Sequence, residues 1–267
     1  MEDLYEWTAA ALHETEVESK LSEVERLETA YRRGELKVRG HPELPGTLEA
    51  GRPAAPRLVP PAKVPRRRLG SREGRAAMLH AIAHIEFNAV NLALDAVVRF
   101  QRMPERFRAD WLRVAAEEVY HFRLVRRRLR ALGHDYGDFP AHDGLWQLAR
   151  KTAADPLLRM ALVPRVMEAR GLDVTPGIRE RFRRVGDLET VSVLDVILRD
   201  EIGHVEAGSR WFRHLCRERG LEPEKTYFDL LARHLGNRIS CPLHRTAREA
   251  AGFSPTELDR LERLCRE

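Results

Sequence analysis

Apolar residues recur every three to four positions along most of this 267-residue chain, which is the spacing of amphipathic helices. The pattern therefore predicts an all-α protein. Four long helices are expected, with shorter helical segments before and after them. The long helices run from Ser71 to about Gln101, from Pro104 to Gly133, from about Pro156 to Gly171 and from Asp187 to about Arg217.

Proline and glycine mark the segments around these helices. Residues 3–33 have helical spacing, as one helix or two, whereas seven prolines between residues 41 and 70 exclude regular helix over most of that stretch. It is predicted to be an extended strap against the domain or else a flexible linker. Two or three short helices are expected after residue 220, one of them starting at Ser254 with Glu257 three residues later. The predicted domains are an N-terminal helical extension (1–40), the proline-rich strap (41–70), a four-helix bundle (71–217) and a C-terminal helical extension (218–267).

The motif Glu-x-x-His occurs on two of the predicted long helices, as Glu118 to His121 and as Glu201 to His204. Residues three apart project from one face of a helix, so each pair can hold one metal ion. Both residues of each pair fall within the apolar stripe of their helix. The motifs are therefore expected to be buried.

A single glutamate on the preceding helix accompanies each motif. Glu86 precedes the first motif by 32 residues and Glu168 precedes the second by 33. Glu86 interrupts an apolar stripe at its centre, whereas Glu168 follows Pro164 by one turn, where a kink is expected. Four inward glutamates and two histidines on four helices are the ligand set of a dinuclear carboxylate site. The alternative is that each buried acid meets an arginine across the core, since a buried carboxylate needs a compensating charge.

The six candidate metal ligands are assigned to two ions, one for each helical hairpin, with one or two glutamates bridging the ions. The first ion is expected at Glu86, Glu118 and His121, the second at Glu168, Glu201 and His204, and the bridges at Glu118 and Glu201.

Several neighbouring side chains have two interpretations. Glu117 and Asp200 could accept the N–H of a ligand imidazole, or could be solvated helix charges. Tyr120 could be redox-active or could serve in packing. His80 and His84 lie off the apolar stripe of their helix and are expected to be packing or surface residues.

Charge and cysteine content bear on the possible partners and the location of the protein. The net charge of +5 comes mainly from arginine, with clusters at residues 66–68, 126–128 and 179–184 that could bind RNA phosphates or decorate solvated helix faces. The three cysteines lack metal-binding spacing and are expected to be reduced. No apolar run is expected to reach membrane-span length and no signal pattern is found, so the protein is predicted to be cytoplasmic.

With the six candidate ligands in order, the sequence resembles the ferritin-like superfamily of dinuclear iron or manganese carboxylate proteins. More narrowly, residues 75–100, 165–176 (RVMEARGLDVTP), 199–204 and 247–258 (AREAAGFSPTEL) are similar to a bacterial ferritin-like family catalogued as a domain of unknown function. This resemblance covers nearly the whole chain. It implies a ferritin-like bundle and the metal site, but no substrate. The ligand pattern also resembles that of the ferritin-like tRNA hydroxylase, which oxidises a modified adenosine beside the anticodon.

The function expected from the ligand set is an oxidoreductase in which two iron ions, or alternatively two manganese ions, activate dioxygen to oxidise a C–H bond. The substrate would be an unidentified small molecule or RNA, and a protein electron donor could supply electrons. One alternative is a ferroxidase or peroxide-scavenging protein without an organic substrate. Another is a metal-stabilised structural or RNA-binding module, which predicts metal-dependent folding without turnover and RNA affinity that falls with salt. Neither the oligomeric state nor the choice of metal follows from the sequence.

Overall fold

The computed structural model describes residues 2–39, 48–65 and 68–266, and every regular element within these ranges is helical apart from two isolated single-residue bridges. The predicted all-α class is therefore confirmed. Contacts divide the chain into two compact units, Met1–Trp146 and Gln147–Glu267. The domain boundaries predicted at residues 40, 70 and 217 stay predictions. The prolines at 42 and 45 of the predicted strap, and the arginines at 66 and 67, lie outside the described residues.

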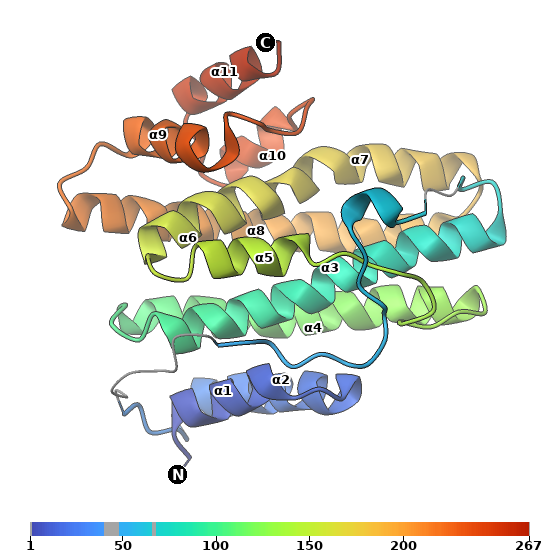
Figure 1. Cartoon of the computed structure of the whole chain (residues 1–267), viewed down its shortest axis with the longest axis horizontal. Coiled ribbons are helices and arrows are strands. Elements are labelled where there is room, and N and C mark those ends of the chain that lie inside the picture. The colour runs from blue at the N-terminus through green and yellow to red at the C-terminus, as the bar shows by residue number, and fades with distance from the viewer. Residues whose placement is uncertain (1, 40–47, 66–67, 267) are drawn as a thin grey trace. The chain divides into compact units, whose positions relative to one another are not determined.

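Two helical hairpins form the first unit (Figure 1). Helices α1 (Leu4–His13) and α2 (Val17–Arg32) make the shorter one, and α3 (Arg72–Arg99) and α4 (Glu105–Ala131) make the longer one. Helix α1 packs on α3 and α2 packs on α4, so the shorter hairpin covers one face of the longer. The segment at residues 3–33, predicted as one helix or two, is two helices.

Helix α3 is the core helix of the first unit. It starts after Ser71, whose Oγ accepts the N–H of Gly74 as an N-cap, so the helix begins where the sequence pattern predicts. By length and composition α3 could cross a membrane, so the expectation that no segment reaches that length was wrong. However, 89% of its most apolar window is buried inside the protein, which is the environment of a core helix.

Residues 48–65 lie along the first unit as an extended strap with one 3₁₀ turn, Pro61–Lys63. The N–H of Gly51 donates to the Leu12 carbonyl at 2.8 Å, and the Lys20 ammonium donates to the Gly51 carbonyl at 2.9 Å. A Cβ atom at position 51 would meet the His13 carbonyl oxygen at 2.0 Å, so this close approach requires glycine. Over its described length the strap is therefore held against the helices and is not a free linker.

The connection after α4 contains a short helix, α5 (Gly144–Lys151). The loop before this helix folds back onto α3, because the Gly137 N–H donates to His80 Nε2 at 3.0 Å. The guanidinium of Arg72 at the start of α3 donates to the Leu132 carbonyl at 2.9 Å. These bonds tie the loop to the core helix of the first unit.

The second unit is built on a hairpin whose second arm is α8 (Leu188–Glu218). The first arm consists of α6 (Pro156–Leu162), a π-helical turn η2 (Val163–Glu168) and α7 (Ala169–Arg184). Pro164 in the turn has no N–H to donate, and the helix widens there, so that the N–H of Ala169 donates to the Pro164 carbonyl five residues back. The kink predicted at this proline takes the form of a π turn.

The helix after the π turn is longer than the sequence pattern predicts. An end near Gly171 is expected, but α7 continues to Arg184 and includes Pro176. A glycine lowers helix stability by about 1 kcal/mol without ending a helix that has a buried face. Leu172 and Phe182 provide that face and are both fully buried. Tertiary packing therefore overrides the local signals.

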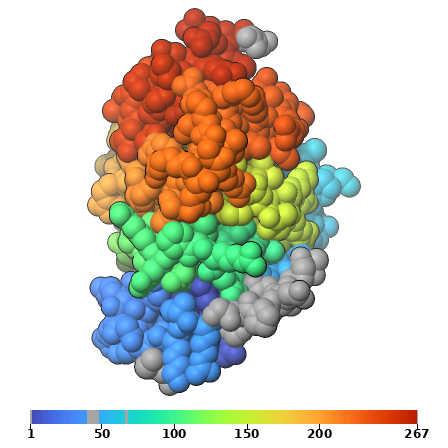
Figure 2. Space-filling view, turned by 90° about the vertical axis from the view of Figure 1, so that its left-hand side faces the viewer, coloured from blue at the N-terminus to red at the C-terminus, as the bar shows by residue number. Residues whose placement is uncertain are grey.

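Three short helices complete the second unit: α9 (Pro223–Leu235), α10 (Arg245–Ala250) and α11 (Pro255–Leu264). Helix α9 packs on α6 and α8, α10 packs on α7 and α8, and α11 packs on α10. The orange to red residues of this part of the chain lie together in the space-filling view (Figure 2). Ser254 and Glu257 form the predicted capping box at the start of α11.

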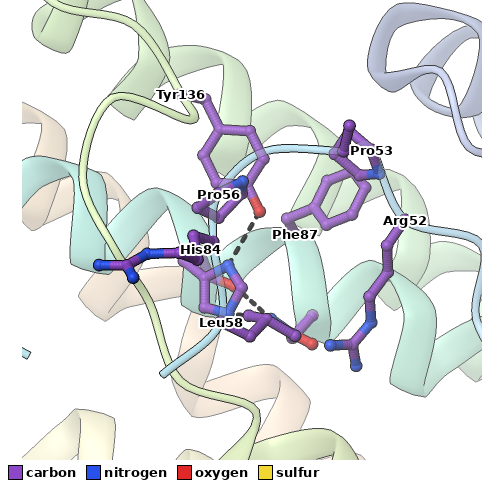
Figure 3. A pocket seen from close by; sticks show the side chains of 10 residues that line it. Arg52, Pro53, Pro56, Leu58, His84, Phe87 and Tyr136 are labelled. Atoms are coloured by element: carbon purple, nitrogen blue, oxygen red, sulfur yellow. Dashed lines mark hydrogen bonds between the residues drawn. The ribbon is translucent and has the colours of Figure 1, made fainter. Parts of the chain in front are cut away.

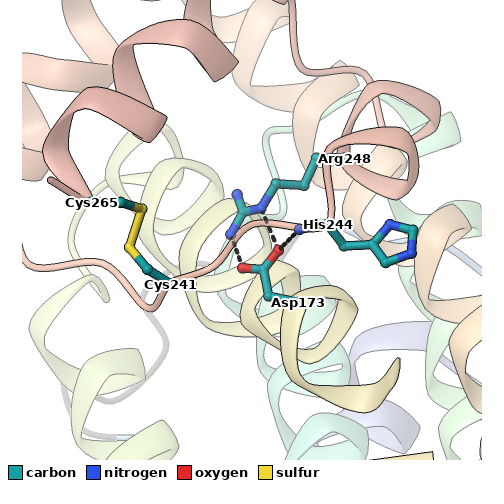
Figure 4. Close-up of a disulfide and its surroundings, with 5 residues drawn as sticks. All are labelled: Asp173, Cys241, His244, Arg248 and Cys265. Carbon is teal, nitrogen blue, oxygen red and sulfur yellow. Dashed lines mark hydrogen bonds and ion pairs between the residues drawn. A yellow bond between two sulfur atoms is a disulfide. The ribbon is translucent and has the colours of Figure 1, made fainter. Parts of the chain in front are cut away.

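Two of the three cysteines form a disulfide, which corrects the expectation of reduced thiols. Cys241 and Cys265 are 24 residues apart in the sequence, but the fold brings their Cα atoms to 5.9 Å, within reach of a disulfide (Figure 4). Cys216 on α8 is a free, buried thiol, and burial raises its pKa to about 11. The cysteine argument for a cytoplasmic location therefore loses its support, and that location stays a prediction.

Candidate metal centre

Three potential metal ligands come together in the first unit, where α3 faces α4. Glu86 lies in the middle of α3, and Glu118 and His121 lie one turn apart on α4. Their ligand atoms are within 4.8 Å of one another. His121 Nδ1 lies 3.4 Å from a carboxylate oxygen of each glutamate. A Glu/His cluster with this geometry could hold a metal ion.

The environment of this cluster is apolar, because it lies within the buried stripes of both helices. Glu118 and His121 are 0% exposed and Glu86 is 4% exposed. Burial by itself lowers the pKa of His121, but hydrogen bonds and charge from the two carboxylates raise it to about 11. A proton on this imidazole thus supplies positive charge in the metal-free protein. A divalent cation would supply the same charge and take all three side chains as ligands.

The second Glu-x-x-His motif has matching local geometry on α8 of the second unit. His204 Nδ1 lies 3.6 Å from a carboxylate oxygen of Glu201, close to the 3.4 Å between His121 and Glu118. The imidazole of His204 is fully buried, and Glu201 is partly exposed. Each motif therefore presents a carboxylate and an Nδ1 atom from one face of its helix.

Glu168, the remaining candidate ligand, is the last residue of the π turn and is half-buried. Such turns are frequent at functional sites. The turn rests on α8, because a Cβ atom on Gly208 would meet the ring of Pro164 at 2.3 Å. Gly208 follows His204 by one helical turn. The segment that carries Glu168 is thus seated against the helix that carries the second motif.

The six predicted ligands fall into two groups of three, one in each unit, and their roles as ligands stay predictions. The acids that precede the motifs form ion pairs on their own helices, Glu117 with Arg113 at 2.7 Å and Asp200 with Arg199 at 2.8 Å. Tyr120 is 51% exposed, so the packing role considered for it does not apply.

A cavity of about 310 Å³ lies between the strap and α3 in the first unit (Figure 3). Its wall includes Leu58 of the strap, His84 and Phe87 of α3, and Tyr136 of the loop after α4. His84 precedes Glu86 by two residues, which is about 200° around a helix. The cavity and the Glu86 cluster are therefore on opposite faces of α3.

The two histidines expected to be packing or surface residues are buried and hydrogen-bonded. His84 Nδ1 lies 2.9 Å from the Tyr136 hydroxyl and its Nε2 lies 3.2 Å from the His142 carbonyl. The side-chain amide nitrogen of Asn88 also lies 3.1 Å from Nε2. Burial lowers the pKa of His80 and of His84 to about 4. Both are thus neutral imidazoles that fasten the loop to α3, and helical periodicity gave no sign of these bonds.

Arginines of the predicted basic clusters pair with nearby acids in the described part of the chain. Arg126 pairs with Asp135 at 2.6 Å, and Arg179 pairs with Asp195 at 2.6 Å. Arg183 pairs with an acid of its own helix. Pairing of this kind is typical of solvated helix faces. RNA binding by these clusters stays a prediction.

Together, the fold and the cluster define an all-α protein with a buried carboxylate–histidine site that could hold a metal ion. The chain matches the family described as "Protein of unknown function (DUF455)" over residues 13–259, and it belongs to that family. It is similar to an uncharacterized protein of Haemophilus influenzae, with 48% identity over 232 residues that cover 84% of this chain and 81% of the relative. No solved structure matches the chain. The family description assigns no activity, so the function has to be argued from the site.

Proposed function

We propose that this protein is an oxidoreductase that uses a dinuclear metal carboxylate centre to activate dioxygen. The observation that carries the proposal is the cluster of Glu86, Glu118 and His121, buried and with ligand atoms within 4.8 Å of one another. Carboxylates and imidazoles are ligands that iron and manganese both accept. Nothing in a purely structural core requires two carboxylates to be buried side by side, since their mutual repulsion opposes burial.

In this proposal the two helical hairpins associate as a ferritin-like four-helix bundle, and the second unit supplies the other half of the centre. Glu86, Glu118 and His121 hold one ion, and the other is held by Glu168, Glu201 and His204. Charge supports two ions, because four carboxylates and two neutral imidazoles carry four negative charges and two divalent cations carry four positive ones. A neutral centre is the form that a dry interior tolerates best.

The protein's own residues would hold and shield the centre. Glu118 and Glu201 are the proposed bridges, because each leads a motif whose histidine Nδ1 already lies beside it. Apolar side chains such as Ala83, Val90 and Ala115, all fully buried, keep water away from the first half of the site. A bound pair of ferrous ions would supply electrons to dioxygen and so permit oxidation of a C–H bond. A small-molecule or RNA substrate, a protein electron donor and a cytoplasmic location belong to the proposal.

The experiment is elemental analysis of the full chain after anaerobic loading with ferrous iron or with manganese, followed by removal of loose metal. We expect about two ions per chain, the stoichiometry of dinuclear carboxylate bundles. Glu118→Gln and Glu201→Gln should each lose one ion or both. The matched controls Glu105→Gln on α4 and Glu206→Gln on α8 should keep both. Circular dichroism will show that all four variants are folded.

Dioxygen uptake by the iron-loaded protein then tests the reaction. Uptake by the wild type that is lost in Glu118→Gln supports the oxidoreductase. Uptake that only matches oxidation of the added iron would identify the ferroxidase alternative. Absence of metal after loading with both ions, or two bound ions without dioxygen uptake, would refute the proposed function. The second of these results would leave a metal-stabilised module.

A further inference from the structure

A cavity of about 200 Å³ in the second unit has an unusual concentration of positive charge. Side chains from the π turn, from α7, from α9 and its following segment, and from α10 form its wall. No acid lies on this wall among the described residues. The arginines that line it are Arg165, Arg170, Arg238 and Arg248.

Two of these arginines are buried and neutralised by acids behind the wall. Arg165 Nη2 donates to a carboxylate oxygen of Glu257 at 2.7 Å. Arg248 donates to both oxygens of Asp173, at 2.9 and 2.7 Å (Figure 4). These pairs fix the guanidinium planes in place. Because each of these two arginines is neutralised by an acid, the net charge of the cavity comes from the other two arginines.

The other two arginines, Arg170 and Arg238, are exposed to solvent. Within residues 2–39, 48–65 and 68–266, neither forms an ion pair. Arg238 makes only a long hydrogen bond, from its Nε to the Leu235 carbonyl at 3.4 Å. The cavity therefore has an excess of two positive charges. An anion entering it would gain attraction without breaking an existing pair.

The wall also contains a buried N–H donor and apolar side chains. The Nε atom of Arg165 is inaccessible to water and has no hydrogen-bond acceptor in the described part of the chain. Leaving such a donor unsatisfied costs about 1–3 kcal/mol, more when the group is charged. Met167, Ile239 and the ring of Tyr227 add apolar surface, and Ser240 adds a hydroxyl. The wall thus combines guanidinium donors with an apolar patch.

We propose that this cavity binds a small phosphomonoester. A phosphomonoester carries a charge of about −1.5 to −2 at neutral pH, which matches the excess of two positive charges. Guanidinium groups bind phosphate oxygens through paired N–H donors, and arginine suits this geometry better than lysine. A cavity of about 200 Å³ leaves room beyond the phosphate for a small organic group against the apolar patch. None of the six proposed metal ligands is part of its wall.

The experiment is a calorimetric titration of the metal-free full chain at fixed ionic strength with phenyl phosphate, inorganic phosphate and phenol. We expect phenyl phosphate to bind, inorganic phosphate to bind more weakly and phenol not to bind. The double variant Arg170→Gln/Arg238→Gln should weaken phenyl phosphate binding by about tenfold or more. Both substituted side chains are exposed, so this variant should fold normally.

The matched control is Arg217→Gln/Arg233→Gln, which removes the same charge from exposed positions of α8 and α9 outside the cavity wall. It should bind phenyl phosphate as the wild type does. Equal weakening in both double variants would show attraction by overall charge and overturn the site. Absence of binding at millimolar phenyl phosphate would overturn it too. Because no metal is present, neither result bears on the proposed oxidoreductase.

Discussion

Glu257→Gln removes the negative charge from a buried ion pair and leaves its partner in an apolar cage. Arg165 is 1% exposed, and its Cζ atom lies 4.3 to 4.8 Å from the centres of three aromatic rings. Its Nη2 donates to Glu257 at 2.7 Å. The amide has nearly the shape of the carboxylate and can still accept the Ser254 N–H of the capping box. The variant therefore changes charge with little change in packing.

The expected cost follows from this geometry. Removing one partner of a buried pair destabilises a protein by about 3–5 kcal/mol. The three ring faces retain part of the attraction for the guanidinium, about 2 kcal/mol for a desolvated cation. We therefore expect Glu257→Gln to cost about 3 kcal/mol, at the lower end of the range. Arg165→Met should cost a similar amount, because it leaves the carboxylate buried without its cation.

A double-mutant cycle measured by urea unfolding separates the pair from the packing. Arg165→Met/Glu257→Gln leaves no charge behind, so it should be more stable than the sum of the single changes by about 2 kcal/mol or more. Hydrogen exchange of the α10 and α11 amides will report the second unit specifically. The control is the exposed pair of Lys225 with Asp229 on α9, 2.5 Å apart, whose removal should have no measurable effect. If the changes in unfolding free energy of the two single variants simply add in the double variant, the reasoning is refuted.

Two further perturbations test other contacts. Gly208→Ala should destabilise the protein by about 1–3 kcal/mol in urea, because the added Cβ would meet the Pro164 ring at 2.3 Å. Gly177→Ala, whose Cβ would meet nothing within 4 Å, should stabilise it by up to about 1 kcal/mol, and equal effects would contradict this assignment. Burial lowers the pKa of His84 from 6.5 to about 4, so the unfolded chain binds its proton first as the pH falls. Stability should then drop between pH 6.5 and 4 by about 1.4 kcal/mol per pH unit for this group. His84→Gln should remove that part of the slope, and an unchanged slope would contradict the reasoning.

Helical periodicity was enough to place three of the four long helices, α3, α4 and α8, and to put one group of candidate ligands on buried helix faces. Apolar residues flank Glu86 on α3 and Glu118 on α4 at helical spacing, so each carboxylate could be assigned to a buried face. The short loop between the two helices then required those faces to meet. The structure brings both carboxylates to His121 at 3.4 Å. Local sequence patterns are enough to predict a contact when both residues lie on the two helices of one hairpin.

Other features depend on contacts that no local pattern encodes. Cys241 and Cys265 meet because α10 and α11 turn the chain back on itself. His84 is bonded to Tyr136, which lies 52 residues away in a loop without periodicity. The extension of α7 beyond Gly171 depends on the burial of Phe182. In each case the partner is set by tertiary packing and has no signal in the spacing of residues.

The contact between the π turn and α8 should affect both the stability of the protein and its proposed metal site. Pro164 and Glu168 belong to one turn, and that turn is fixed where the proline ring meets Gly208. If Glu168 is a ligand, Gly208→Ala should lower the metal content from about two ions to about one, because only the second group of ligands depends on the turn. Gly177→Ala should leave both ions in place. Two ions in a folded Gly208→Ala protein would remove Glu168 from the ligand set, while the cluster around Glu86 would stand.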